Sequence, residues 1–181
     1  MSWEIDSVHS TVSFAVRHMM VSTVRGHFNV LRGHLHIDED KPANSWVEAE
    51  VDATSIDTHN DQRDAHLRSA GFFNTEIYPL ITFKSTLVEH QDGPNYKITG
   101  DLTMHGVTKS ITFEAEYSGQ SLMGGVQRAG LTAKTKINRK EFGMSLGAVA
   151  EAGQVAVSEM VAIEIDLEVV QQPAAEVAAA Q

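Results

Sequence analysis

The chain has 181 residues, contains no cysteine and carries a formal net charge of −10. This length suits one domain, which can bury enough apolar surface to fold without covalent cross-links. The missing cysteines exclude a disulfide framework, a thiol nucleophile and a cysteine-based metal site. The acidic balance argues against a general nucleic-acid-binding surface, which is normally basic.

The N-terminal stretch MSWEIDSVHS carries Glu4 and Asp6 where a signal peptide has a basic start followed by an apolar run. No stretch reaches the roughly 18 consecutive apolar residues of a membrane span. We therefore expect a cytoplasmic protein with no stable membrane insertion and no nucleic-acid partner.

Alternation of apolar and polar residues is the dominant pattern along the chain. Such alternation is typical of antiparallel strands that have one buried face and one wet face. It predicts strands at 11–19, 46–53, 80–88, 96–104, 109–117, 130–138 and 161–169. Between residues 24 and 38 the phase slips, because Phe28 lies on one parity and Leu31 and Leu35 on the other. A bulge or bend near 30–33, where Gly33 is available, would absorb the slip.

The stretch HNDQRDAHLRS, residues 59–69, interrupts this strand pattern. Thr58 or Asn60 can cap a helix there, and Asp61 and Asp64 favour its N-terminal end. Leu67 gives the helix a small apolar side, and two phenylalanines follow it.

A second irregular stretch, residues 138–146, reads NRKEFGMSL and predicts a polar turn that ends in Phe142 and Met144. With about eight strands, the fold class is all-β, either a sandwich or a closed barrel in which a short helix covers one end. The tail 171–181 contains Pro173 and almost no large apolar residue, so we expect it to be disordered.

Three kinds of chemical site find little support in the sequence. His34 and His36 share one face of a strand, but zinc needs three or four ligands and no matching spacing exists. In the predicted helix, Arg63 and His66 are three residues apart, and Asp64 and Arg68 are four apart, so ion pairing explains these charges without a reaction. The sequence has no nucleophile elbow and no phosphate-cradling glycine loop.

An internal cavity is the remaining candidate for a site. An eight-stranded barrel either fills itself with side chains or encloses one small ligand. His18 is in phase with Val12, Phe14 and Val16 and would face the interior. Periodicity alone does not distinguish a filled core from a hollow one.

Four strings in order resemble the YceI-like family: WEIDSVHSTVSFAVRHMMVSTVRGHF, RDAHLRSAGFFNTEIYPLITFKST, GDLTMHGVTKSITF and INRKEFG. The resemblance implies an extended eight-stranded, antiparallel, lipocalin-like barrel over residues 1–170. It also implies binding of a polyisoprenoid or related amphiphile, with no catalysis. Because RDAHLRS belongs to a family string, we expect Arg63, Asp64 and His66 to fix the helix to the barrel.

We expect a carrier or storage protein whose ligand is an isoprenoid quinone, a prenyl phosphate or a fatty-acid-like lipid, with no other cofactor and no metal. His18 and Arg139 are expected at the head group. The predicted ligand contacts are Phe14, Val16, His18, Phe28, Val47, Ala49, Val51, Phe72, Phe83, Leu102, Met104, Phe113, Arg139, Phe142, Met144 and Ile163.

Two alternatives stay open at this point. One is a hydrolase or isomerase that acts on a bound lipid through histidine or aspartate residues. The other is a structural or interaction protein with a filled barrel. Barrels with open mouths often pair, so a homodimer is also expected.

Overall fold

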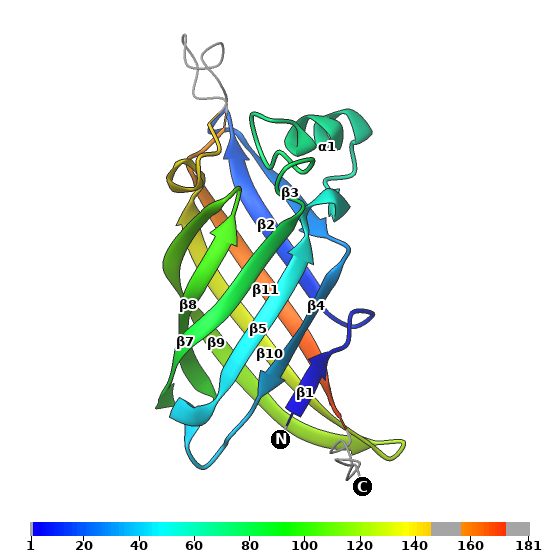
Figure 1. Cartoon of the computed structure of the whole chain (residues 1–181), viewed down its shortest axis with the longest axis vertical. Helices are drawn as coiled ribbons and strands as arrows, with labels where there is room; N and C mark the ends of the chain where they lie inside the picture. The colour runs from blue at the N-terminus through cyan, green and yellow to red at the C-terminus, as the bar shows by residue number, and fades with distance from the viewer. Residues whose placement is uncertain (1, 146–156, 173–181) are drawn as a thin grey trace, which may run out of the picture.

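The computed structural model describes residues 2–145 and 157–172 (Figure 1). Its strands are β1 (Ser2–Ile5), β2 (Thr11–His18), β3 (Ser22–Phe28), β4 (Leu31–His36), β5 (Trp46–Asp52), β6 (Ile56–Asp57), β7 (Leu80–Asp92), β8 (Asn95–Met104), β9 (Val107–Met123), β10 (Val126–Asn138) and β11 (Met160–Gln171). Its helices are α1 (Asp61–Arg68) and the short 3-10 turns η1 (Pro42–Asn44), η2 (Ala53–Ser55) and η3 (Arg139–Phe142).

The strands form one closed antiparallel barrel. Along the sheet the order is β1, β4, β5, β7, β8, β9, β10 and β11, and β11 pairs back onto β1. Strand β11 also pairs with β2, which continues through β3 to β6. The eleven segments occupy eight positions, because β1 with β2, β3 with β4, and β5 with β6 each share one position. The predicted eight-stranded, lipocalin-like barrel is therefore confirmed.

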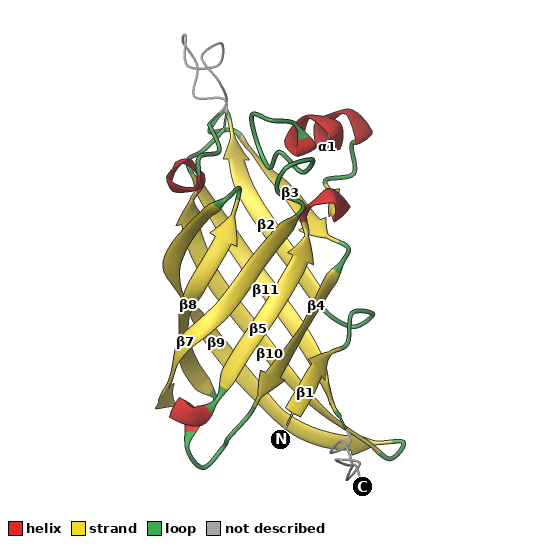
Figure 2. Cartoon of the chain, viewed as in Figure 1, coloured by secondary structure: helices red, strands yellow, loops and turns green. Residues whose placement is uncertain are grey.

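Figures 1 and 2 show how the strands are inclined and what lies at each end of the barrel. The strands run obliquely around the barrel axis. Helix α1 covers the end opposite the start of β1 and the end of β11, which we call the terminal end. The loop between β4 and β5 and the hairpin between β9 and β10 lie at the terminal end. The barrel thus has a helix-covered end and an end formed by hairpins and loops.

The predicted phase slip is present as a break between β3 and β4. Phe28 and Leu31 both face the interior, although three positions separate them, because Asn29 and Val30 leave the ladder. The backbone N–H of Asn29 donates to the Ser55 carbonyl at 3.2 Å, and that of Val30 donates to Ser55 Oγ at 3.1 Å. Turn η2 thereby satisfies the donors that the break exposes.

Helix α1 begins as the sequence predicts, with the Asn60 side chain accepting from the Arg63 N–H at 2.8 Å. Asp64 is buried and accepts from the Thr58 N–H at 2.9 Å and the Thr58 hydroxyl at 2.5 Å. Arg63 donates to the Thr58 hydroxyl and carbonyl at 2.8 and 2.7 Å. Arg63 and Asp64 therefore fix the helix to the segment before it.

One predicted pair in this region does not form. Arg68 does not pair with Asp64, whose carboxylate is already bound to Thr58; it donates instead to the carbonyls of Thr54 and Ile56, at 2.9 and 3.1 Å. His66 makes an edge contact with Phe72, with ring centroids 5.1 Å apart. Arg68 therefore adds to the attachment of the helix, and the contact of His66 with buried Phe72 is consistent with the role expected of His66.

The C-terminal boundary lies later than predicted. Gln171 belongs to β11, and the Gln172 N–H donates to the Ser2 carbonyl at 3.1 Å. The rest of the predicted tail, 173–181, lies outside the described residues. Within the described part of the chain, no helix is long and apolar enough to span a bilayer.

Gly33 lies where β4 approaches β5 too closely for any larger residue. A Cβ atom there would lie 2.3 Å from the Glu48 carbonyl oxygen and 2.8 Å from the Ala49 Cα. Both are backbone atoms, so they cannot move aside without shifting a strand. We predict that Gly33→Ala lowers the free energy of unfolding by about 1–3 kcal/mol, measured by denaturant titration.

Gly71→Ala is the matched control, because the nearest atom to its added Cβ would lie 3.8 Å away. It should change stability by no more than about 0.5 kcal/mol. Equal stabilities of the two variants would contradict the close approach of β4 and β5.

Candidate functional site

The barrel encloses an apolar cavity of about 220 Å³. Its wall runs from Leu67 of α1 and Phe73, in the segment after it, to Ile5 and Leu167 near the terminal end. In another protein an engineered apolar cavity of about 150 Å³ stays dry and binds benzene. A hollow of this size and lining is therefore suited to an apolar guest.

Aromatic rings pack around the cavity in edge-on or tilted pairs. Phe28 contacts Phe14 and Phe73, each with ring centroids 5.7 Å apart, and Phe83 meets Phe113 edge-on at 5.3 Å. Space remains because several wall positions carry only a methyl group; these are Ala49, Ala115 and Ala133. Large rings fix the shape of the wall, and the small residues keep it from filling.

The structure places all the predicted ligand contacts on this wall except His18 and Phe142. The same strand alternation would also have found many wall residues that were not predicted. These are Ile5, Val12, Leu31, Leu35, Ile81, Ile98, Ala115, Leu131, Ala133, Ile137, Val161, Ile165 and Leu167. Leu67 and Phe73, by contrast, reach the cavity from α1 and the segment after it, where strand alternation gives no signal.

His18 and Phe142 lie off the wall for different reasons. His18 is the last residue of β2, and there its backbone pairs with Val157, which does line the cavity. Phe142 is fully buried at the end of η3, where its carbonyl oxygen lies 3.0 Å from His105 Nδ1. Alternation predicts His18 on the wall, but His18 is the last residue of β2 and lies off it. Phe142 lies in a 3-10 turn, where strand alternation does not apply.

Arg139 is the charged residue of the described wall, and it is buried. Its guanidinium donates to three backbone carbonyls: Ser158 through Nε at 3.0 Å, Met144 through Nη1 at 2.7 Å and Val157 through Nη2 at 3.1 Å. Burial lowers the pKa of Arg139, and the charge of Glu159 partly opposes that shift.

The described residues include no carboxylate in an ion pair with Arg139. A guanidinium has five N–H donors, and three of them account for the contacts above. A buried positive charge held mainly by carbonyl dipoles favours an anion or a strong acceptor nearby. The cavity thus has a cationic group at the end that lies toward η3.

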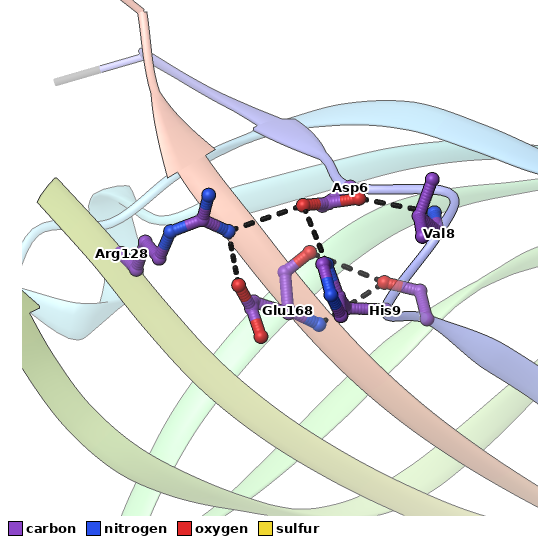
Figure 3. A network of polar contacts seen from close by, with 6 residues as sticks. Asp6, Val8, His9, Arg128 and Glu168 are labelled. Atoms are coloured by element: carbon purple, nitrogen blue, oxygen red, sulfur yellow. Dashed lines mark hydrogen bonds and ion pairs between the residues drawn. The ribbon is translucent and has the colours of Figure 1, made fainter. Parts of the chain in front are cut away.

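A polar network near the opposite end joins the loop between β1 and β2 to β10 and β11 (Figure 3). Arg128 Nη1 contacts the carboxylates of both Asp6 and Glu168, and His9 Nδ1 lies 3.0 Å from Asp6 Oδ2. The Ser10 hydroxyl donates to the Glu168 carbonyl at 3.1 Å and accepts from the Glu168 N–H at 3.0 Å. Ser10 thereby replaces the strand partner that β11 lacks at this point.

Asp6, His9 and Glu168 place their ligand atoms within 4.8 Å of one another, which is close enough to hold a metal ion. The guanidinium of Arg128 already supplies the positive charge that the two carboxylates need. We therefore interpret the network as a structural clamp. The two histidines of β4 are not among these residues: His34 is exposed, and His36 is half-buried where β4 pairs with the start of β1.

The match to known proteins fits this architecture. The model of the YceI-like domain matches residues 3–169. The chain belongs to the YceI-like family. It is 45% identical to protein YceI of Escherichia coli O17:K52:H18 over 136 residues, which are 74% of this chain and 70% of the relative.

Two solved structures share the fold. Burkholderia cenocepacia BcnA superposes with a TM-score of 0.82 at 21% identity, covering 91% of this chain and 98% of that one. A polyisoprenoid-binding domain from Saccharophagus degradans, implicated in plant cell wall breakdown, gives a TM-score of 0.72 at 16% identity and covers 94% and 98%.

The clamp between Asp6 and His9 predicts a defined pH response. The hydrogen bond with Asp6 raises the pKa of His9 above 6.5, and the same bond contributes most to lowering the pKa of Asp6 to about 2. The His9 contribution to stability is lost as pH rises through its raised pKa. The Asp6 contribution is lost as pH falls from 3.8 through about 2.

NMR titration of the His9 ring tests this response. Asp6→Asn should return the His9 pKa toward its ordinary value and remove the loss of stability that follows its deprotonation. An identical His9 pKa in the two proteins would show that the clamp does not operate in solution.

Proposed function

We propose that this protein binds a polyisoprenoid or a similar long-chain amphiphile inside the barrel, without catalysis, and serves in its transport or storage. Candidate ligands are an isoprenoid quinone, a prenyl phosphate or a fatty-acid-like lipid. The observation that carries the proposal is the enclosed apolar cavity with the buried cation Arg139 at one end. The relationship to a polyisoprenoid-binding fold neighbour supports the same ligand class.

The energetics favour a long tail over a short one. Each buried methylene contributes about 0.8 kcal/mol, whereas association costs about 4–15 kcal/mol in lost freedom and ordering. A tail of several isoprene units offsets that cost even when the head group makes few contacts. Tail length and cavity shape should therefore dominate selectivity, and Arg139 should add a preference among head groups.

The composition of the wall supports binding over a hydrolase or isomerase acting on the lipid. In the described part of the wall the polar residues are Ser13, Thr82 and Arg139, and a guanidinium stays protonated near neutral pH. Acid–base chemistry on a bound lipid would need a group that exchanges protons there. The hollow interior likewise speaks against the filled-barrel alternative. A homodimer and a cytoplasmic location remain predictions.

Filling the cavity should block uptake without unfolding the barrel. Ala49 lies on the wall, half-buried, in the middle of β5. We predict that Ala49→Trp weakens farnesol binding at least about tenfold, because an indole takes up the space of the guest. Binding is measured by displacement of a fluorescent polyene fatty acid.

Glu48→Trp is the matched control, because Glu48 is the neighbouring residue on the outer face, paired with Lys84 at 2.7 Å. It places the same indole on the same strand without touching the cavity, so its affinity should equal that of the wild type. Undiminished uptake by folded Ala49→Trp would contradict binding in the barrel interior.

Arg139 should discriminate between head groups that share one tail. We predict that Arg139→Met lowers the ratio of hexadecanoate to hexadecanol affinity by about tenfold or more, because a charge-assisted contact is lost. The ratio cancels any general loosening of the barrel. Arg32→Met is the control, since Arg32 is exposed on the outer face and paired with Glu50 at 2.9 Å. A ratio that Arg139→Met leaves unchanged would remove Arg139 from the head-group site.

A further inference from the structure

A second, smaller hollow of about 60 Å³ lies at the end of the barrel that α1 does not cover. It shares part of its wall with the main cavity, namely Leu35, Val47, Ile98, Ala115 and Leu131. The remainder of its wall comes from the β4–β5 loop and from aromatic residues, among them Trp46, Tyr96 and Tyr117. The smaller hollow therefore adjoins the main cavity, and we call it the end compartment.

A bridge of side chains crosses the barrel at this compartment. The Tyr117 hydroxyl donates to Glu39 Oε1 at 2.7 Å, and Gln120 Nε2 donates to the same oxygen at 2.8 Å. Glu39 lies in the loop between β4 and β5, whereas Tyr117 belongs to β9. Strands β5, β7 and β8 separate β4 from β9 in the sheet, so the contact spans the opening of the barrel and does not follow its wall.

The loop that carries Glu39 is itself tightly held by Asp38. The Asp38 carboxylate accepts from the Lys41 N–H at 2.8 Å and from Asn44 Nδ2 at 2.9 Å, while the Asp38 N–H donates to Ser45 Oγ at 2.9 Å. Burial, together with the bond to Glu39, raises the pKa of Tyr117, so its hydroxyl remains a donor near neutral pH. The hydrogen bonds of Asp38 thus order the loop that carries Glu39.

We propose that the end compartment receives the far end of the ligand tail, and that Tyr117 and Glu39 form the floor that limits tail length. This inference rests on the proposed lipid-binding function. The charges at the two ends favour that orientation, because Glu39 would repel an anionic head group and Arg139 at the other end would attract one. The polar atoms of the floor are bonded to each other, which leaves ring surface to meet the tail.

Trp46 offers a direct reporter of occupancy, since it lines the end compartment. The sequence has one other tryptophan, Trp3, which is fully buried in the core. Trp3 Nε1 has no hydrogen-bond partner among the described residues, so Trp3→Phe removes an unsatisfied donor. In that variant all tryptophan fluorescence comes from Trp46.

The test uses hexadecanoic acid brominated either at its terminal carbon or next to the carboxylate. Bromine quenches tryptophan fluorescence only near contact. In Trp3→Phe protein, the terminally brominated acid should quench Trp46 and the head-brominated isomer should not. Native mass spectrometry of the same samples records whether each acid is bound.

Each of the other outcomes overturns the inference in a distinguishable way. Quenching by the head-brominated isomer alone would reverse the orientation. Binding of both acids without quenching would leave the end compartment empty while the proposed function stands. If neither acid binds, both the inference and fatty-acid binding in the barrel fail together.

Tyr117→Ala tests the floor as a limit on tail length. Removing the ring should raise the affinity for a six-unit prenol relative to farnesol about tenfold, which corresponds to about two further buried methylenes. Gln120→Ala is the matched control, because Gln120 bonds to the same Glu39 oxygen but does not line the compartment. An unchanged preference in folded Tyr117→Ala, or an equal rise in Gln120→Ala, would overturn the assignment of the floor to Tyr117.

Discussion

Strand β11 closes the barrel, and the other features of the molecule depend on that closure. Its residues pair with β10 along one edge, and along the other edge they pair first with β2 and then with β1. Closure pairs β11 along both of its edges, so most of its backbone groups are satisfied within the sheet. The clamp of Asp6, His9, Arg128 and Glu168 lies at the point where β11 changes partner. The clamp stabilises the point where this edge of β11 has no strand partner.

Once the barrel is closed, its interior is a fixed volume that side chains either fill or leave open. Alanines at several inward positions leave it open, and phenylalanines packed edge-on keep the wall from collapsing. Binding energy then comes from burial of the apolar tail, which does not favour one orientation of the ligand over the other. The polar groups at the two ends of the cavity differ, and this difference favours one orientation. Arg139 stands at one end and the Glu39–Tyr117 bridge at the other. The tail and the head group of a ligand would thus contact chemically different groups, and neither contact requires a catalytic residue.

The resemblance to the YceI-like family predicts the barrel, since the strand pattern alone fits a sandwich as well. Alternation with a period of two predicts many of the wall residues, because it translates directly into facing direction. It locates the slip between Phe28 and Leu31 for the same reason. Alternation is less informative at strand ends and outside strands. It predicts His18 on the wall, but His18 is the last residue of β2 and lies off it; Phe142 lies in a 3-10 turn, and Arg68 bonds to carbonyls that helical spacing cannot indicate. The bridge from Glu39 to Tyr117 was not predicted, because its partners are 78 positions apart and meet only after closure.

The central claim is that the closed barrel holds a lipid in its interior. Native mass spectrometry of the freshly purified protein, followed by organic extraction and mass analysis of the released compound, tests it most directly. The account predicts a mass excess that resolves into one long-chain amphiphile, whose formula distinguishes a quinone, a prenyl phosphate and a fatty derivative. A bare protein mass, together with failure to reload prenols or fatty acids, would contradict the account and leave a barrel without a lipid ligand.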